Sequence, residues 1–385
     1  MKHGIYLDSA ATTKPNYLSL ETFNQINSDL WHNPNSTMYE AGISARRMLE
    51  DARKKIANCI GADSEQIIFT SGSTEGANTI IQGFVPRGRE RDYAIIVSPI
   101  EHPAVWECVK HMSGYGVDSS VLNCDESGIV DLSHLEMLLE KYKYKDGILV
   151  CIMDSNNEIG CVQPTKDIAR LVHSYDRARL FCDMTQSYAH SASYKVDDLD
   201  YDYACASAQK FEGLRGTGFL YIRQPSSIKP LIYGGGQERG IRSGTENVAG
   251  ICSMAEVFAE SCSTRQQTVM RLYDIRKRLM DDLSSIGGVI ISPDDGLSNL
   301  VSVLFHGVSA NNVISMLGTR GIMLSSGSAC STDKRSPSRI LKSIGLSDDD
   351  AFSVLRISFS EQTHIAELDT FIRELKGVLN CLSTE

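Results

Sequence analysis

The sequence predicts an α/β protein with a mixed, mostly parallel sheet flanked by helices and a smaller α+β part. Three observations lead to this prediction. Short runs rich in β-branched and aromatic residues alternate with segments of helical periodicity. Polar residues directly follow five of these runs. Near residue 261 a long amphipathic stretch separates them from a second, smaller group of strand-like runs.

Six runs have the composition and length of buried strands, and we expect them to form the main sheet. They are QIIFT (66–70), AIIVS (94–98), GILVCIM (147–153), ARLFC (178–182), YACAS (203–207) and GFLYI (218–222). Between them lie helix-like segments such as residues 131–142, where leucines recur at helical spacing. This alternation is typical of α/β layering.

The C-terminal part begins with a predicted long helix. From residue 261 onward, apolar residues lie on one helical stripe, and a Gly-Gly pair ends it. The runs GVIISP, NLVSVLF and VLRISF follow, with a last helix near residues 363–381. We therefore expect a large domain over residues 16–260 and a small domain made of residues 1–15 and 261–385, joined by the long helix.

Composition and charge restrict the function classes. The chain has 385 residues, 42% of them hydrophobic, and a formal net charge of −10. This charge argues against nucleic acid or an anionic membrane surface as a direct partner. The N-terminal MKHGIYLDSAATTKP lacks the apolar run of a signal peptide, and no window resembles a membrane span. We therefore expect a cytoplasmic protein.

The chain contains 11 cysteines, and no two of them have CxxC spacing. Zinc binding or a thioredoxin-like dithiol is therefore not expected. Cys151, Cys182, Cys205 and Cys252 lie in apolar or small-residue runs, and we expect them to be buried. Cys330 differs, because it lies in the flexible polar stretch SSGSACS (325–331).

Polar residues at the ends of five predicted strands give the first indication of a site. SGSTEG (71–76) follows the first of these runs, and EH (101–102) lies beyond the second. The next three are followed by DSNNE (154–158), DMTQ (183–186) and AQK (208–210). One such group alone is as well explained by a turn or a helix cap. Because open α/β sheets bind ligands at the carboxyl ends of their strands, the five together predict a common site.

The residue types at these strand ends fit pyridoxal phosphate. Gly72, Ser73 and Thr74, at the start of a predicted helix, offer N–H and hydroxyl groups to a phosphate. Asp183 and Lys210 each follow a buried strand. Pyridoxal phosphate needs a lysine for covalent attachment and an acid beside its pyridinium nitrogen. No GxxxxGK[ST] motif is present and no GxGxxG opens a first βαβ unit, so nucleotides are poorly supported.

With these residues the chain resembles the class V, fold-type I pyridoxal-phosphate enzymes, and among them the NifS/IscS-type cysteine desulfurases. The resemblance extends from YLDSAATT near the N-terminus to VLRISF near the C-terminus. Seven blocks carry it: HNPNS (32–36), FTSGSTEGAN (69–78), EHPAV (101–105), NNEIG (156–160), DMTQS (183–187), GGGQERGIRSGTEN (234–247) and SSGSAC (325–330). RSGTEN and SSGSAC favour the NifS/IscS branch. The resemblance implies a homodimer with L-cysteine as substrate, pyridoxal 5'-phosphate as cofactor and a sulfur-acceptor protein as partner.

The resemblance also implies a role for each matching residue. Lys210 would hold the cofactor and move protons at the substrate Cα. His102 would stack on the cofactor ring and relay a proton. Asp183 would pair with the pyridinium nitrogen. Asn157 and Gln186 would contact the phenolic oxygen of the cofactor.

The other implied contacts concern the phosphate and the substrate. The phosphate would be held by Ser73, Thr74, Ser207 and Gln209, together with Thr245 of the partner subunit. Asn33 and Arg356 would hold the substrate carboxylate, Arg356 through the forked geometry of its guanidinium.

Cys330 is implied to be the sulfur acceptor. Its thiolate would attack the sulfur of the bound cysteine and keep it as a persulfide, with alanine as the other product. Lys334 and Arg335, close downstream, would favour the thiolate. The Gly/Ser-rich loop would let the sulfur reach the cofactor and then an acceptor protein.

Four positions depart from the family pattern. Gln209 stands where a histidine usually precedes the lysine, which predicts weaker cofactor binding. Met184 replaces a small residue and is expected to crowd the pocket. GLRG (213–216) replaces a GPKG-like sequence, and SE (360–361) replaces the usual basic residue after Arg356. These changes indicate a divergent paralogue.

Two other functions remain open at this point. The chain would be another class V enzyme, such as a selenocysteine lyase or an aminotransferase, if turnover did not need Cys330. It would be a sulfur-relay scaffold if Gln209 and Met184 had weakened the cofactor site. The acceptor is equally open among iron–sulfur scaffolds, tRNA thiolation and DNA phosphorothioation pathways.

Overall fold

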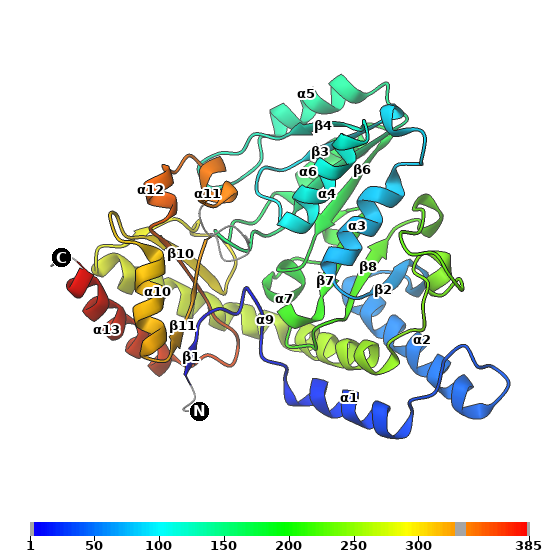
Figure 1. Cartoon of the computed structure of the whole chain (residues 1–385), viewed down its shortest axis with the longest axis horizontal. Coiled ribbons are helices and arrows are strands. Elements are labelled where there is room, and N and C mark those ends of the chain that lie inside the picture. Colours follow the sequence, from blue (N-terminus) through cyan, green and yellow to red (C-terminus); the bar gives the residue numbers. More distant parts are fainter. Residues whose placement is uncertain (1–3, 328–335, 383–385) are drawn as a thin grey trace.

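The computed structural model describes residues 4–327 and 336–382. Its main sheet has seven strands in the order β2-β8-β7-β6-β5-β3-β4, and only β8 runs antiparallel to its neighbours (Figure 1). The strands are β2 (Ile67–Thr70), β8 (Gly218–Ile222), β7 (Tyr203–Ser207), β6 (Ala178–Asp183), β5 (Gly147–Met153), β3 (Tyr93–Val97) and β4 (Asp118–Val121). The six predicted strands are confirmed, while the polar edge strand β4 was not predicted.

Alternate residues of these strands point to opposite faces of the sheet, and each face has its own hydrophobic cluster. One face packs against α1 (Tyr17–Asp29), α2 (Glu40–Ile60), α5 (Leu132–Tyr142), α6 (Thr165–His173) and the first part of α9 (Val248–Ser285). The other packs against α3 (Ser73–Phe84) and α4 (Pro103–Gly114), which lie side by side in Figure 1. Because both faces are covered, strands such as β5 are buried along their full length.

A second sheet forms the smaller part of the molecule, in the strand order β12-β13-β10-β9. Its strands are β12 (Ser325–Ser326), β13 (Val354–Ser358), β10 (Leu300–Leu304) and β9 (Val289–Ile290). Beside it, β1 (Ile5–Tyr6) pairs in parallel with β11 (Ile322–Met323). α10 (Ala310–Thr319), α13 (Ile365–Leu382) and the second part of α9 share one hydrophobic cluster with this sheet. The N-terminal segment therefore packs with the C-terminal part of the chain.

Helix α9 connects the two parts without interruption (Figure 1). The predicted stripe and its end at the Gly-Gly pair are confirmed, since α9 ends at Ser285 and Gly287 adopts a φ of +92°. The helix begins at Val248, however, well before the expected start near residue 261. The proposed domain boundary at residue 260 falls inside α9, so the division into two domains stays a prediction.

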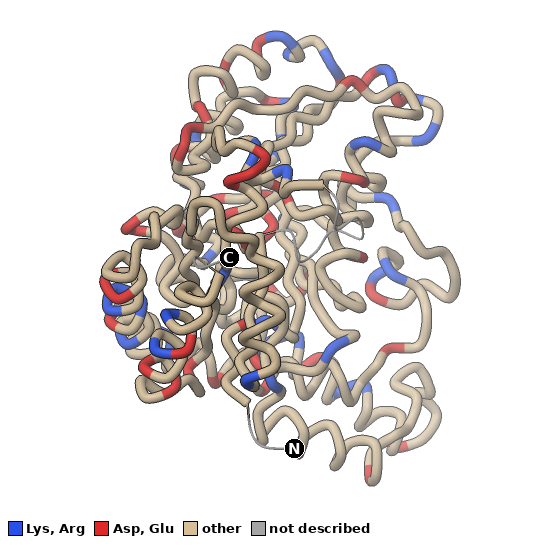
Figure 2. Tube along the Cα trace, turned by 60° about the vertical axis from the view of Figure 1, so that its left-hand side comes forward, with Lys and Arg blue, Asp and Glu red and all other residues tan. Residues whose placement is uncertain are grey.

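Short elements connect these layers. They are the helices α7 (Ser187–His190), α8 (Val196–Leu199), α11 (Arg339–Ser343) and α12 (Asp348–Ala351), and the 3₁₀ turns η1 (Ser64–Gln66), η2 (Glu90–Asp92), η3 (Ala208–Lys210), η4 (Pro225–Ser227) and η5 (Glu238–Gly240). Acidic and basic residues are interspersed along the chain (Figure 2). Over residues 4–327 and 336–382, none of the helices combines the length and apolarity needed to cross a membrane. The four cysteines that were expected to be buried are buried.

Candidate functional site

The strand ends that carry the predicted polar groups lie at one edge of the main sheet, because β2, β3, β5, β6 and β7 are all parallel. Contacts join groups from different strand ends. The Ser207 hydroxyl accepts a hydrogen bond from the Ser73 N–H at 2.7 Å and donates to Ser73 Oγ at 2.9 Å. Gln186 Nε2 and Lys210 Nζ both donate to the Ala10 carbonyl, at 3.1 and 2.7 Å. The residues after β2, β6 and β7 therefore meet.

The start of α3 has the form of an anion site. Gly72 precedes the helix with a φ of +150° and offers no side-chain cap, and the first N–H group of α3, that of Ser73, donates to the Ser207 hydroxyl instead. A Cβ on Gly218 would lie 2.6 Å from the Gly72 Cα, so a glycine at 218 lets β8 approach this turn. Ser73 is half-buried and Thr74 is exposed at the mouth of the turn.

Asp183 and Lys210 lie on two neighbouring strands of this edge. Asp183 is the last residue of β6, is almost fully buried, and accepts hydrogen bonds from the N–H and hydroxyl groups of Thr185. Lys210 ends η3 directly after β7, and its amine also donates to the Ala11 carbonyl at 2.8 Å. The charges of both residues act on the ring of His102. Asp183, Lys210 and His102 therefore belong to the same edge of the main sheet.

His102 caps α4 and at the same time belongs to the site. Its Nδ1 accepts the Ala104 N–H at 3.1 Å, so the neutral ring carries its proton on Nε2. Burial lowers the pKa of His102; Asp183 opposes this effect, and Lys210 and Arg339 add to it. The ring is therefore neutral near pH 7. A helix cap, one of the two explanations given above for any single strand-end group, is therefore correct for His102, and its stacking role stays a prediction.

The polar groups around Lys210 fit pyridoxal phosphate. Asn157 Oδ1 and Gln186 Oε1 are buried, and neither has a hydrogen-bond partner within the described parts of the chain. An unsatisfied buried polar atom costs about 1–3 kcal/mol, so these amides are better explained by a polar ligand beside them. Side-chain amides both donate and accept, which suits the oxygen substituents of a pyridoxal ring. The turn before α3 would take the phosphate, Asp183 the pyridinium nitrogen and Lys210 the covalent attachment, so each part of the cofactor has a partner.

A family model described as "Aminotransferase class-V" matches residues 5–371. The chain belongs to this family. Since the match spans both sheets and α9, it covers the whole fold and not the site alone. The expectation of a fold-type I pyridoxal-phosphate enzyme is confirmed.

Curated relatives and solved structures place the chain with the NifS/IscS-type proteins of the class V family. "Cysteine desulfurase IscS" of Dictyoglomus turgidum is 34% identical, over 100% of this chain and 96% of the relative. A structure titled "NIFS-LIKE PROTEIN" superposes with a TM-score of 0.91 at 32% identity, covering 98% of this chain and 99% of the other. One titled "SspA in complex with cysteine" superposes with a TM-score of 0.80 at 30% identity, covering 92% and 99%.

On the substrate side, Arg356 is already engaged by protein groups. It lies in the middle of β13, is 1% exposed, and donates to the Asn157 carbonyl at 3.0 Å and to Asp8 Oδ1 at 2.7 Å. Its Nε is buried and has no hydrogen bond to any described residue. A substrate carboxylate would therefore bind in competition with Asp8, which the sequence did not predict.

Two predicted site residues, Asn33 and Thr245, lie apart from this cluster. Asn33 is exposed in the loop between α1 and α2, where its side chain accepts the Asn35 N–H at 2.9 Å. Thr245 is exposed in the turn before α9. The substrate role of Asn33 and the phosphate role of Thr245 from the partner subunit therefore both stay predictions.

Met184 and Gln209, two positions that depart from the family pattern, have different surroundings. Met184 is fully buried in the hydrophobic cluster of the α9 face, which takes up its bulk. Gln209 is half-buried in η3, and its carbonyl accepts hydrogen bonds from the N–H and hydroxyl groups of Thr13. The backbone of Gln209 thereby ties the N-terminal segment to the lysine turn, while its side-chain role stays a prediction.

Cys330, Lys334 and Arg335 lie outside the described residues. The chain that leads to them is described as far as Gly327, and it starts from β12, where Ser325 pairs with Arg356. A Cβ on Gly327 would lie 2.8 Å from the Leu341 side chain. The Gly/Ser-rich segment therefore begins beside the strand that carries the predicted substrate clamp.

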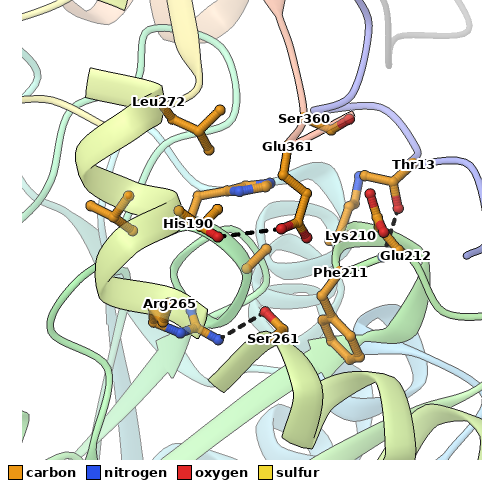
Figure 3. Close-up of a pocket in the computed structure, with 13 residues that line it drawn as sticks. Thr13, His190, Lys210, Phe211, Glu212, Ser261, Arg265, Leu272, Ser360 and Glu361 are labelled. Carbon is orange, nitrogen blue, oxygen red and sulfur yellow. Dashed lines mark hydrogen bonds between the residues drawn. The ribbon is translucent and has the colours of Figure 1, made fainter. Parts of the chain in front are cut away.

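A pocket beside Lys210 contains groups that sequence reasoning missed (Figure 3). His190 lines it, buried with 7% of its surface exposed, and neither ring nitrogen has a hydrogen bond to the described residues. Burial, with smaller effects of Arg265 and Lys210, lowers the pKa of His190 to about 3. Glu361, at the position where a basic residue is usual, faces the same pocket. Only the missing basic residue pointed to this region in the sequence.

Proposed function

We propose that this protein is a pyridoxal-phosphate-dependent cysteine desulfurase that uses Cys330 as its sulfur acceptor. The observation that carries the proposal is that the ends of β2, β6 and β7 meet: Ser207 binds Ser73 at the anion turn, and Gln186 and Lys210 share the Ala10 carbonyl, with Asp183 at the end of β6. This arrangement supports cofactor binding at the edge of the main sheet. The relatives named cysteine desulfurase support the reaction.

When bound, pyridoxal phosphate withdraws electrons from the substrate Cα, so that the bonds to this carbon become easier to break. Lys210 holds the cofactor and takes or returns the Cα proton. Asp183 keeps the pyridine nitrogen protonated through a charge-assisted hydrogen bond. His102, neutral and with its proton on Nε2, would stack on the cofactor ring and relay a proton to the substrate Cβ, which needs one to become the methyl group of alanine once its bond to sulfur breaks.

Arg356 orients the substrate by its carboxylate, with two parallel N–H groups in place of the bond to Asp8. Cys330 then accepts the substrate sulfur. Its loop starts at β12, which pairs with the strand of Arg356, and this anchoring supports an approach from the substrate side. The resulting persulfide is carried by Cys330, and its outer sulfur is then transferred to an acceptor protein.

Two partners belong to this proposal. A second copy of the chain would complete the site, and the exposed apolar side chains of Trp31, Met38 and Tyr233, near Asn33 and Thr245 in the sequence, support such an interface. A sulfur-acceptor protein would receive the sulfur, for example an iron–sulfur scaffold. We place the reaction in the cytoplasm, where cysteine thiols stay reduced.

The test is turnover of L-cysteine by the holoenzyme with a reductant, measuring alanine and sulfide together. The wild-type protein should produce both. Cys330→Ser should still bind cofactor and cysteine but form no protein persulfide, while Cys381→Ser, a change at an exposed cysteine of α13, should leave turnover intact. A persulfide on another cysteine would refute the role of Cys330.

The two alternatives give different results. A selenocysteine lyase or an aminotransferase would keep full turnover of its preferred substrate after Cys330→Ser. A sulfur-relay scaffold would show no visible absorbance of lysine-bound cofactor even after addition of pyridoxal phosphate. Lys210→Ala is the control for this absorbance, because it removes the attachment point, and retained colour would exclude Lys210 from that role.

A further inference from the structure

The turn that follows β5 is bound to the small sheet through its backbone. Asn156 Oδ1 accepts the Glu158 N–H at 2.8 Å, which fixes the shape of the turn. The Glu158 carbonyl accepts the hydroxyl of Ser302 in β10, and the Asn157 carbonyl accepts Arg356 of β13 at 3.0 Å. Because β10 and β13 are paired, one turn of the main sheet contacts two neighbouring strands of the small sheet.

The Glu158 side chain is buried at this junction. Glu158 is 7% exposed, and its Oε2 accepts the Ser338 hydroxyl at 2.5 Å. Burial raises the pKa of Glu158 to about 7, while Ser338, Arg356 and Arg339 oppose this effect. Burying a carboxyl is costly unless it is hydrogen-bonded, and the bond from Ser338 offsets part of that cost. The carboxyl and the hydroxyl therefore hold each other in place.

The same carboxyl contacts the chain on both sides of residues 328–335. On the N-terminal side, a Cβ on Gly327 would lie 3.5 Å from Glu158 Oε2. On the C-terminal side, Ser338 donates to this oxygen and at the same time caps the start of α11. The two sides also touch each other, since a Cβ on Gly327 would lie 2.8 Å from the Leu341 side chain. One carboxyl oxygen thus lies against both ends of the segment.

Both ends are also attached to the surroundings of the candidate site. Before the segment, Ser325 of β12 pairs with Arg356, the predicted substrate clamp. After it, Arg339 donates to the carbonyls of Pro99 and Glu101, in the turn that leads to α4. The ends that Glu158 joins therefore lie between the substrate side and the turn that carries the predicted stacking histidine.

We propose that Glu158 is a positioning residue for sulfur transfer. Its carboxyl holds the two chain ends that flank residues 328–335, so that the segment carrying Cys330 starts and ends beside Arg356. The inference rests on the proposed function, because it requires Cys330 to accept the substrate sulfur. Glu158 itself touches neither cofactor nor substrate and transfers no proton. Loss of this anchor should slow the sulfur transfer and spare the earlier steps, since a misplacement of about 1 Å can cost on the order of 100-fold in rate.

The test compares two reactions of the holoenzyme. Exchange of the Cα proton of L-alanine with deuterium needs the cofactor site but no sulfur acceptor, and NMR follows it. Persulfide formation on Cys330 in a single turnover of L-cysteine is followed by rapid quenching and mass spectrometry. Glu158→Ala should slow persulfide formation about ten- to a hundredfold, and leave the exchange rate and the Kd of pyridoxal phosphate within about twofold of the wild type.

Three further variants show whether the hydrogen bond to Ser338 is the cause. Glu158→Gln keeps an oxygen that accepts the Ser338 hydroxyl, so it should keep most of the wild-type rate. Ser338→Ala should be as slow as Glu158→Ala, and the double variant no slower than either, because each loses the same contact. Ser347→Ala is the matched control, since Ser347 caps α12 as Ser338 caps α11 but is exposed and contacts Asp350 instead. It should leave the rate unchanged.

The outcomes distinguish this inference from the proposed function. A wild-type protein that forms no persulfide on Cys330 would overturn both. If the wild type forms it, the role of Glu158 alone is overturned by an unchanged rate in Glu158→Ala, by a Glu158→Gln variant that is equally slow, or by additive effects of Glu158→Ala and Ser338→Ala. An equal loss of Cα exchange would also overturn it, because the whole site would then be disturbed. Where Glu158→Ala does not fold, Ser338→Ala against Ser347→Ala decides.

Discussion

Arg356 Nη2 donates to Asp8 Oδ1 at 2.7 Å, so Asp8, just after β1, forms an ion pair with Arg356 in β13, the last strand. The contact joins the N-terminal segment to the small sheet, beside the isolated bridge between Asp8 and Ser358. In the proposed reaction the same guanidinium must hold the substrate carboxylate. In that reaction Asp8 would occupy the carboxylate position at Arg356 until L-cysteine binds.

Replacing Asp8 tests whether it competes with the substrate carboxylate for Arg356. Asp8→Asn removes a competing charge, so the KM for L-cysteine should fall about tenfold, equal to about 1.4 kcal/mol. The same change leaves the buried Arg356 without its carboxylate partner, so the Tm of the substrate-free protein should drop. Cysteamine, which has no carboxylate, is the control ligand and should bind both proteins equally. An unchanged KM for L-cysteine would show that Asp8 does not compete.

The Ser207 hydroxyl links two strand ends at the anion turn, and its removal should weaken cofactor binding. Ser207→Ala deletes a phosphate donor and leaves the Ser73 N–H without its partner. We expect the Kd of pyridoxal phosphate to rise about tenfold, consistent with the loss of one charge-assisted hydrogen bond. Equilibrium dialysis of the holoenzyme measures it. Ser71→Ala, on the exposed side of the same turn, should leave the Kd unchanged; equal effects of both changes would contradict the role of Ser207.

Gln209 offers a test of the divergence of this chain. If the lost histidine weakens phosphate binding, Gln209→His should slow the loss of cofactor in dialysis several-fold. The backbone bonds of this residue to Thr13 do not depend on the side chain, so the fold should be unaffected. Unchanged retention would show that the glutamine serves the phosphate as well as histidine does.

Glu212 should make stability depend on pH. It is 8% exposed with a φ of +63°, and burial, followed by Glu361, raises its pKa to about 7; Glu260 adds to this, while Gln362 and Lys14 oppose it. The unfolded value is 4.5, so the folded state holds a proton that the unfolded state loses between pH 4.5 and 7. Its contribution to stability is therefore full below pH 4.5 and is lost as the pH rises through 7.

Glu212→Gln keeps an acceptor for Gln362 but cannot ionise. The variant should match the wild type in unfolding free energy near pH 4.5 and exceed it at pH 8, by at most about 3 kcal/mol. Denaturant unfolding at both pH values measures this. Parallel pH profiles of the two proteins would mean that Glu212 is ionised already at low pH.

Sequence patterns predicted the main sheet and the convergence of its strand ends, because both depend on local composition and on parallel pairing. They missed features without a local signal. The first part of α9, residues 248–260, is buried on nearly all sides and so has no amphipathic stripe. Strand β4 is mostly exposed and polar. Neither an amphipathic stripe nor a hydrophobic run was therefore available to predict these two elements.

Long-range contacts were equally invisible. Asp8 entered the sequence analysis only as part of the YLDSAATT block. Its place beside the small sheet could not be predicted, because β1 and β11, which pair there, are only two residues long. His102 shows the opposite case. From the sequence we preferred a cofactor-stacking role for it to a helix cap, and the structure shows the cap, while the stacking role stays a prediction.

The uninterrupted course of α9 has a mechanical consequence. At 1.5 Å of rise per residue, its 38 residues form a rod of about 57 Å whose two ends lie in different hydrophobic clusters. Unfolding of either hydrophobic cluster would remove the packing that stabilises one half of α9, and the other half of the helix would then fray. Heat should therefore disrupt the whole molecule in one calorimetric peak, and a separately expressed C-terminal fragment beginning at residue 261 should remain unstructured.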